Sequence, residues 1–414
     1  MSSPVSNSTN HVALVRRISA FAGLPMLALL APFIFLPVLS RVAGADAWVA
    51  IALGQSVGGF VALFAGLGYT TLAPPLVAVA SPKKRRRILA TSVHVRLPVW
   101  LAACTIGMAF AALLAPSSHR LEAALMAAAM SLAALAPTWF WIGVGRAMPI
   151  LWTEVVPRIL ATIAAIAALL AGGGAIWYPI LLAISMIAGP AIVYARVVGV
   201  ELLRVDRSEV MNVLRHHPPG VIAETAAGVY SNLAVTVVAA VTPVANAARY
   251  VSGDKAYRIG QYSVSALGNA LQGWVVEARE SAIAHRMRVV IILHAGLGIL
   301  GLITFGLLGP WLTRTVFVAE FAINTAAAFG FGTAILGITL GTAFGRIGLI
   351  TIGARKAFMA CVVVASTVGI VALVIGASQW GVVGAAWGMG ITELLSGLAQ
   401  GVVLKVLWRR RAPQ

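Results

Sequence analysis

Charged residues are scarce in this sequence, and acidic residues are the scarcest of them. Lys, Arg, Asp and Glu together make up 10% of the 414 residues, whereas a soluble domain carries about 25%. Hydrophobic residues account for 60%, and the mean hydropathy is +0.95. So little charge leaves no room for a sizeable aqueous domain, and the sequence therefore predicts a membrane protein.

Several kinds of functional site are excluded by what is missing. Only two cysteines occur, Cys104 and Cys361, and both fall inside apolar stretches. The sequence thus has neither a disulfide framework nor a cysteine spacing typical of a metal site. It has no Gly-rich loop followed by a lysine that would bind nucleotide phosphates, and no paired carboxylates at the predicted outer surface. We expect a protein that is not an enzyme and that holds no metal ion or cofactor.

What the sequence does contain is a series of long apolar stretches separated by short basic clusters. A helix that crosses the hydrocarbon core of a bilayer needs about 20 mostly apolar residues. By this criterion we predict an all-α polytopic membrane protein with about 12 transmembrane helices. The expected spans are Ile18–Leu39, Ala47–Pro75, Leu97–Leu114, Leu121–Val144, Ile150–Leu170, Ile176–Val193, Val221–Val244, Ile259–Val276, Val289–Leu308, Phe321–Phe344, Ala357–Gly376 and Val382–Leu404.

Basic residues are distributed unevenly between the two sides of these spans. Of the 30 Lys and Arg residues, 24 fall on the side of the termini and six on the other side. Because cytoplasmic loops are enriched in Lys and Arg, we expect a multi-pass plasma-membrane protein with both termini cytoplasmic. This bias and an attraction to anionic membrane lipids account for the net charge of +18, so nucleic acid is not an expected partner.

The longest polar connection divides the predicted spans into two equal sets. It follows span six, and a chain built from two six-helix halves is common among transporters, which bind substrate between the halves. The predicted organisation is an N-terminal half at residues 1–200, a cytoplasmic linker at 201–219 and a C-terminal half at 220–414.

Polar residues beside span eight mark a candidate site, because burying them in a bilayer is costly. The expected outer loop at 249–258 and the start of the following span form the most polar stretch on that side. Helical spacing places Arg258, Gln261 and Ser265 on one face, which predicts a polar stripe facing a central cavity. The alternative is that tyrosines and arginines anchor this segment at the membrane interface.

Acidic residues inside the spans are few. Glu224 lies in the first turns of span seven, with Asn232 two turns further along the same face, and Glu393 lies in span twelve. A carboxylate that faces a cavity can exchange a proton or bind a cation. Glu224 and Glu393 are therefore the candidate ion-coupling residues, and a salt bridge between Glu224 and Arg215 is the alternative for the first.

Two further patterns concern helix packing. Gly337, Gly341 and Gly345 recur every four residues in span ten, a spacing that lets two helices approach closely. Glu154 and Arg158 are four residues apart in span five, a separation that favours an ion pair within a helix.

Three parts of the sequence carry motifs in a recognisable order. They are Leu36-Pro-Val-Leu-Ser-Arg41-Val-Ala-Gly44 continuing through Trp48 and Gln55 to Leu67-Gly68-Tyr69; Pro137-Thr-Trp-Phe-Trp141 with Gly145-Arg146; and Val229-Tyr-Ser-Asn232 with Tyr250-Val-Ser-Gly-Asp-Lys255-Ala-Tyr-Arg258. In this order they resemble the first helix pair, the inner turn between helices four and five, and the region of helices seven and eight in the polysaccharide flippases of the MOP (multidrug/oligosaccharidyl-lipid/polysaccharide) exporter superfamily.

The resemblance implies a MOP/MATE-like fold and an O-antigen flippase of lipopolysaccharide biosynthesis. Such a protein moves undecaprenyl-diphosphate-linked oligosaccharide repeat units across the plasma membrane by alternating access with ion coupling. It implies a lipid-linked oligosaccharide as partner, with a polymerase and glycosyltransferases as candidate partners. Basic groups in a central cavity suit a diphosphate, whose charge must be paired away from water. The substrate-binding candidates are Arg41, Gln55, Asn232, Arg249, Lys255, Arg258 and Gln261.

Two other functions remain open on the sequence alone. One is a MATE-like, cation-coupled multidrug exporter, which would be expected to carry acidic cation sites within its helices. The other is a non-transporting membrane component of a polysaccharide assembly complex.

Overall fold

The computed structural model describes residues 34–199, 205–215, 220–276 and 280–411, and every regular element in these ranges is helical. Residues 34–42 are helical and precede α2. The elements of the first part are α2 (Gly44–Gly66), α3 (Tyr69–Val79), α4 (Pro82–Leu114), η1 (Ser117–His119), α5 (Arg120–Ser131), η2 (Leu132–Leu135), α6 (Thr138–Val144), α7 (Met148–Ile150), η3 (Leu151–Val155), α8 (Val156–Leu170), α9 (Trp177–Val193) and η4 (Tyr194–Val198). Those of the second part are α10 (Arg207–Arg215), α11 (Gly220–Val241), α12 (Val244–Val276), α13 (Glu280–Val316), η6 (Ala319–Phe321), α14 (Thr325–Gly341), η7 (Thr342–Leu349) and α15 (Arg355–Arg411).

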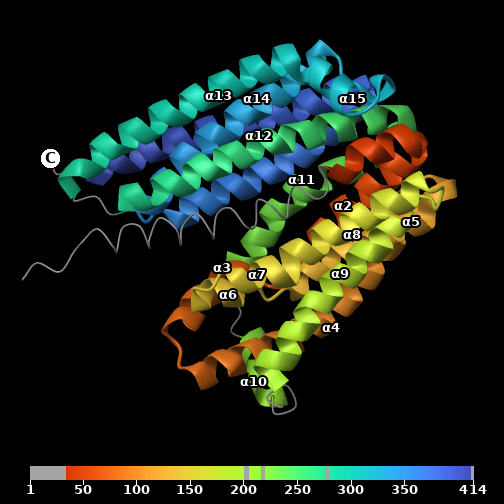
Figure 1. The fold of residues 1–414 in the computed structure, drawn as a ribbon. Helices are drawn as coiled ribbons and strands as arrows, with labels where there is room; N and C mark the ends of the chain where they lie inside the picture. The colour runs from red at the N-terminus through yellow and green to blue at the C-terminus, as the bar shows by residue number, and fades with distance from the viewer. Residues whose placement is uncertain (1–33, 200–204, 216–219, 277–279, 412–414) are drawn as a thin grey trace, which may run out of the picture.

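The early and the late helices form two bundles (Figure 1). In the first bundle α2 packs against α4 and α5, α5 packs against α9, and α8 packs against α9. In the second bundle α14 lies between α13 and α15 and also contacts α12. Helix α11 contacts both α2 and α15, so it joins the two bundles. The predicted all-α architecture with two helical halves is confirmed.

The last helix, α15, contains two predicted spans. Its 57 residues are far more than the roughly 20 that a span needs. The helix breaks at Trp380 and Gly381, whose backbone angles are not helical. A Cβ added at Gly376 would lie 2.3 Å from the carbonyl oxygen of Gly384, so the arms before and after the break pack closely against each other. They correspond to spans eleven and twelve.

Eight helical segments of the described residues are long and apolar enough to cross a membrane. One of them, Arg355–Arg410, holds the two arms of α15. Helix α12 is 33 residues long but is not among the eight, because uncharged polar as well as charged residues are spread along its sequence. The first predicted span, Ile18–Leu39, lies mostly outside the described residues.

The predicted outer loop before span eight is wrong. Helix α12 begins at Val244, directly after Pro243, and residues 249–258 form part of this helix rather than a loop. The polar side chains are accommodated because they pair with one another and with α2: Arg258 bonds Asp254, and Lys255 bonds Gln55. Their polarity therefore marks a buried contact between the bundles and not a chain reversal in solvent.

The predicted ends of two early spans also need correction. The second span stops at Gly66, because Leu67 and Gly68 take left-handed backbone angles (φ 50° and 68°) and a separate helix, α3, follows. The third span belongs to a helix that starts much earlier, at Pro82, where the Ser81 side chain caps the Lys84 amide. Arg96, counted above among the basic residues flanking a span, consequently lies within this helix.

Candidate functional site

The contact between the bundles is made by α2 on one side and by α11 and α12 on the other. The Trp48 indole nitrogen donates a hydrogen bond to the carbonyl oxygen of Ala248 (3.1 Å). About two helical turns further along α2, the Ser56 hydroxyl donates to the carbonyl oxygen of Asn232 and lies 2.8 Å from the Thr236 hydroxyl. All these groups are buried or half-buried. This end of the interface is therefore closed by direct contacts.

A buried cationic cluster, formed by Lys255 and Arg258 of α12, lies beside these contacts, where Lys255 meets Gln55 of α2. The Lys255 ammonium donates to the Gln55 side-chain oxygen at 2.8 Å, and both side chains are buried. An ammonium has three hydrogens to donate, and within the described residues only Gln55 accepts one. The cluster thus has donors in reserve for an anionic ligand.

The neighbouring turn of α12 carries a second cation and its counter-ion. Arg258 Nε donates to an Asp254 carboxylate oxygen at 2.8 Å. Asp254 is almost fully buried, whereas 26% of the Arg258 side chain is exposed. With Lys255, these groups carry two positive charges and one negative charge. A buried cluster with a net positive charge favours an anion, because charges away from water need partners of opposite sign.

A polar stripe continues along α12 beyond Arg258. Gln261 is half-buried and Ser265 is exposed. Along this direction the two bundles move apart in Figure 1. On α12, the exposure of the face that carries Arg258, Gln261 and Ser265 therefore rises toward the end where the bundles separate.

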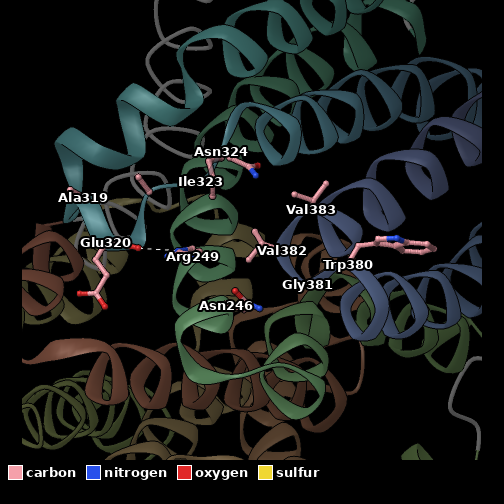
Figure 2. Close-up of a pocket in the computed structure, with 11 residues that line it drawn as sticks. Asn246, Arg249, Ala319, Glu320, Ile323, Asn324, Trp380, Gly381, Val382 and Val383 are labelled. Atoms are coloured by element: carbon pink, nitrogen blue, oxygen red, sulfur yellow. Dashed lines mark hydrogen bonds between the residues drawn. The ribbon is translucent and has the colours of Figure 1, made fainter.

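Two predicted substrate residues lie on the opposite rim instead. Arg41 donates to the carbonyl oxygen of Thr315 (2.8 Å), near the C-terminal end of α13, where a cation is favourable. Arg249 donates through Nε to the carbonyl oxygen of Glu320 (3.1 Å), as Figure 2 shows. Both arginines are exposed. Each therefore binds backbone at the rim, whereas Lys255 lies in the buried cluster.

Arg249 lines a separate pocket of about 450 Å³ at this rim. Its other polar walls include Asn246 and Asn324, and the break in α15 at Trp380 and Gly381 forms a third side. In Figure 2 the Trp380 ring points away from the labelled polar side chains. Asn324 caps α14 by accepting from the Ala327 amide (2.9 Å). The pocket thus lies between the start of α14 and the break in α15.

The remaining predicted residues lie on other elements. Asn232 of α11 contacts α2 through its carbonyl oxygen, and its side-chain amide donates to Gly228 (3.0 Å). Glu224 is on the same helix, but its side chain lies outside the described residues. Glu393 lies inside the second bundle, where it lines a pocket of about 240 Å³ between α14, η7 and both arms of α15. Arg346 and Gln400 share that pocket, so Glu393 is not part of the contact between the bundles.

Sequence reasoning missed Ser56 and Asp254 as members of the site. The i, i+4 spacing of Asp254 and Arg258 was a usable signal. Ser56 lies in the pattern Gly54-Gln-Ser-Val-Gly58, which matches a hydrolase nucleophile elbow in letters alone. The elbow requires a strand-to-helix turn, whereas these residues lie within α2. The two glycines are explained by packing, because a Cβ at either would lie within 2.5 Å of a backbone oxygen of α5.

Comparison with solved structures identifies the fold. No protein-family model matches the sequence, and no curated protein sequence matches it. The inward-facing conformation of a multidrug resistance MATE family transporter of the MOP superfamily matches with a TM-score of 0.69 and 14% identity, covering 95% of this chain and 99% of that chain. The fold is that of the MOP superfamily. The predicted MOP/MATE-like fold is therefore confirmed.

Two further matches to this fold are informative. The lipid II flippase MurJ, in an inward closed conformation, matches with a TM-score of 0.67 and 11% identity, covering 95% of this chain and 93% of that chain. An outward-facing MATE family transporter of the MOP superfamily matches with a TM-score of 0.50 and 12% identity, covering 97% and 93%. Both matches support the same fold for this chain.

Proposed function

We propose that this protein is a flippase that moves undecaprenyl-diphosphate-linked oligosaccharides across the plasma membrane by alternating access. The observation that carries the proposal is the buried cationic cluster of Lys255 and Arg258 at the closed end of the contact between the bundles. A diphosphate needs cations and hydrogen-bond donors when it leaves water. Lys255 and Arg258 supply both, whereas a cation-exporting site would need an excess of carboxylates.

The same contacts suggest how substrate would open the closed end. Lys255 holds the two bundles together through Gln55, and a diphosphate oxygen is a stronger acceptor for an ammonium than an amide oxygen. Transfer of Lys255 to the substrate removes one hydrogen bond between α2 and α12. The remaining polar contacts of Trp48, Ser56 and Arg41 are hydrogen bonds to backbone or hydroxyl oxygens. The Trp48 ring also packs against Phe317 and Phe321, and alternating access would separate these contacts in turn.

A reconstituted transport assay tests this proposal. Proteoliposomes that contain a fluorescent undecaprenyl-diphosphate oligosaccharide are exposed to an impermeant quencher, which reports how much label reaches the outer leaflet. We expect Lys255→Gln and Arg258→Gln to reduce transport at least tenfold, and Arg258→Lys to retain part of it because the charge remains without the planar fork. Arg120→Gln, an exposed arginine of the first bundle, is the matched control.

The same vesicles distinguish the alternatives. If a lipophilic cationic dye is exported and the oligosaccharide lipid is not, the protein is a MATE-like multidrug exporter. The MATE match supports that second candidate, and Glu393 would be its acidic site. If neither compound moves, the protein is a non-transporting component, and co-purification with a polymerase or glycosyltransferase becomes the relevant measurement.

Ion coupling is proposed for Glu224 and Glu393. Glu393 is enclosed in the second bundle beside Arg346, Thr392 and Gln400, and the Gln400 side-chain oxygen has no hydrogen-bond partner within the described residues. Two oxygen ligands in one pocket could receive a cation. Transport by Glu224→Gln and Glu393→Gln is measured across a pH gradient and across a sodium gradient. A variant that responds to both gradients as the wild type does removes that residue from the coupling role.

A further inference from the structure

A pocket of about 510 Å³ lies where α3, α4 and the linker helix α10 meet. Its apolar wall is formed by Leu72, Ala73 and Leu76 of α3 with Ile88 of α4. Leu72 and Leu76 remain 41% and 59% exposed. Covering this apolar surface with an acyl chain would remove it from water.

The other wall of the pocket is charged and carries two basic residues together with Glu209. Lys84 and Arg87 line it, and they belong to a run of five basic residues, 83–87, in the first turns of α4. This is the end of a helix where positive side chains are unfavourable, because the helix dipole already places positive charge there. The arrangement is stabilised when an anion is bound beside it.

Two of the basic side chains are committed to protein partners. Arg85 donates to the carbonyl oxygens of Val77 and Ala78 at the end of α3. Arg87 forms a two-pronged ion pair with Glu209 of α10, with the closest contact at 2.9 Å. These bonds fix the shape of the pocket.

Lys84 differs from Arg85 and Arg87 in its contacts. Its side chain is exposed, and no hydrogen bond or ion pair from its ammonium to another described residue is found. It also lines the pocket. Lys84 is therefore placed to pair with a ligand.

We infer that this pocket binds an anionic glycerophospholipid. The phosphate would pair with Lys84, beside the Arg87–Glu209 ion pair. An acyl chain would cover Leu72 and Leu76. The lipid would then contact α3 and α4 of the first bundle and the linker helix α10 together, which fixes the position of the linker. The flippase proposal is not needed for this assignment.

Lipid binding to the purified full-length protein tests the assignment. Native mass spectrometry measures dissociation constants for phosphatidylglycerol and for phosphatidylcholine with matched acyl chains. We expect phosphatidylglycerol to bind more tightly and Lys84→Gln to weaken it about fivefold, the equivalent of the ~1 kcal/mol that a basic residue contributes near an anionic membrane surface. Lys83→Gln is the matched control, because Lys83 belongs to the same run but does not line the pocket. It should change the constant by less than twofold.

The apolar wall has its own control. Leu76→Gln should weaken both lipids several-fold, whereas Val79→Gln, on the same helix but outside the pocket and 89% exposed, should not. Equal effects of Lys83→Gln and Lys84→Gln would overturn the assignment in favour of general surface attraction. Equal binding of the two lipids by the wild type would also overturn it. Displacement of phosphatidylglycerol by millimolar inorganic phosphate would reassign the pocket to free anions.

Discussion

Arg96 shows how a single residue can be misjudged from sequence. It is 1% exposed, and none of the ion pairs found in the described part of the chain involves it. Its guanidinium donates to the Ser92 carbonyl and hydroxyl oxygens, to the Ala134 carbonyl oxygen (2.5 Å) and to the Tyr194 hydroxyl (3.2 Å). It also lies over the rings of Tyr69 and Trp139. These neighbours replace water around the charge.

The reason for a cation at this position is the break after α5. The chain passes into the 3-10 turn η2, and a helix end leaves carbonyl oxygens without amide partners. Arg96 bonds the oxygen of Ala134, and the Tyr194 hydroxyl bonds that of Leu135 (2.6 Å). Arg96 thus stabilises an irregular turn inside the first bundle.

We expect Arg96→Met to lower the free energy of unfolding by about 2–3 kcal/mol, because it leaves the buried Ala134 oxygen and the Tyr194 hydroxyl without this donor. Thermal unfolding of the detergent-purified protein measures the effect. Arg86→Met is the control, since Arg86 is on the same helix and exposed. Equal melting temperatures for the two variants would contradict a structural role for Arg96.

At the scale of elements, the glycine spacing was a reliable guide. An added Cβ at Gly337 would lie 2.3 Å from the carbonyl carbon of Glu393, so this glycine of α14 packs directly on the α15 backbone. At Gly341 the nearest atoms would be 3.7 Å away or further, whereas at Gly345 the Gln400 side chain would clash. The predicted close approach is confirmed, and it is tightest at Gly337 and Gly345.

Gly337→Ala should destabilise the protein by about 1–3 kcal/mol, because backbone atoms of α15 cannot move aside as a flexible side chain would. Gly296→Ala on α13 is the matched control, since no atom lies within 4 Å of an added Cβ there. It should be neutral or stabilising, because alanine favours a helix more than glycine does. Chemical denaturation in detergent compares the two, and a neutral Gly337→Ala would contradict the packing account.

The ion pair expected between Glu154 and Arg158 illustrates where element-level prediction was wrong. Residues 151–155 form the π-helical turn η3, which changes the angle between positions four apart. Glu154 instead accepts a hydrogen bond from the Thr138 hydroxyl (2.6 Å), and no ion pair within 4 Å joins it to Arg158. The i, i+4 rule applies only where the helix is regular.

For the whole molecule, the contact between the bundles should have to open during transport. Ser56 and Thr236 have hydroxyls 2.8 Å apart across α2 and α11, close enough for a disulfide between cysteines at these positions. With Cys104 and Cys361 replaced, oxidised Ser56→Cys/Thr236→Cys should lose transport and regain it on reduction. Each single variant should be unaffected by oxidant. Full transport by the oxidised double variant, with the disulfide verified by mass spectrometry, would show that this contact stays closed.

The orientation in the membrane is a second property of the whole molecule. The bias of basic residues predicts that Lys83 and Arg207 face the cytoplasm and that Arg120 and Glu320 face outward. Single cysteines at the first two positions should be protected from an impermeant thiol reagent in intact cells, and those at the last two should react. All four side chains are exposed, so burial does not explain a difference. The reverse labelling pattern would show that the protein has the opposite orientation in the membrane.

The sequence by itself determined the fold class and most of the spans, because long apolar stretches can satisfy their backbone in a bilayer only as helices. It also pointed to α12 as the polar helix of the site. Only the tertiary structure showed that 249–258 is helical, that Lys255 meets Gln55, 200 residues earlier, and that Arg41 and Arg249 bind backbone at the rim. These are contacts between segments distant in the chain. Local periodicity specifies which face of a helix is polar, but the partner of that face is decided by how the bundles pack.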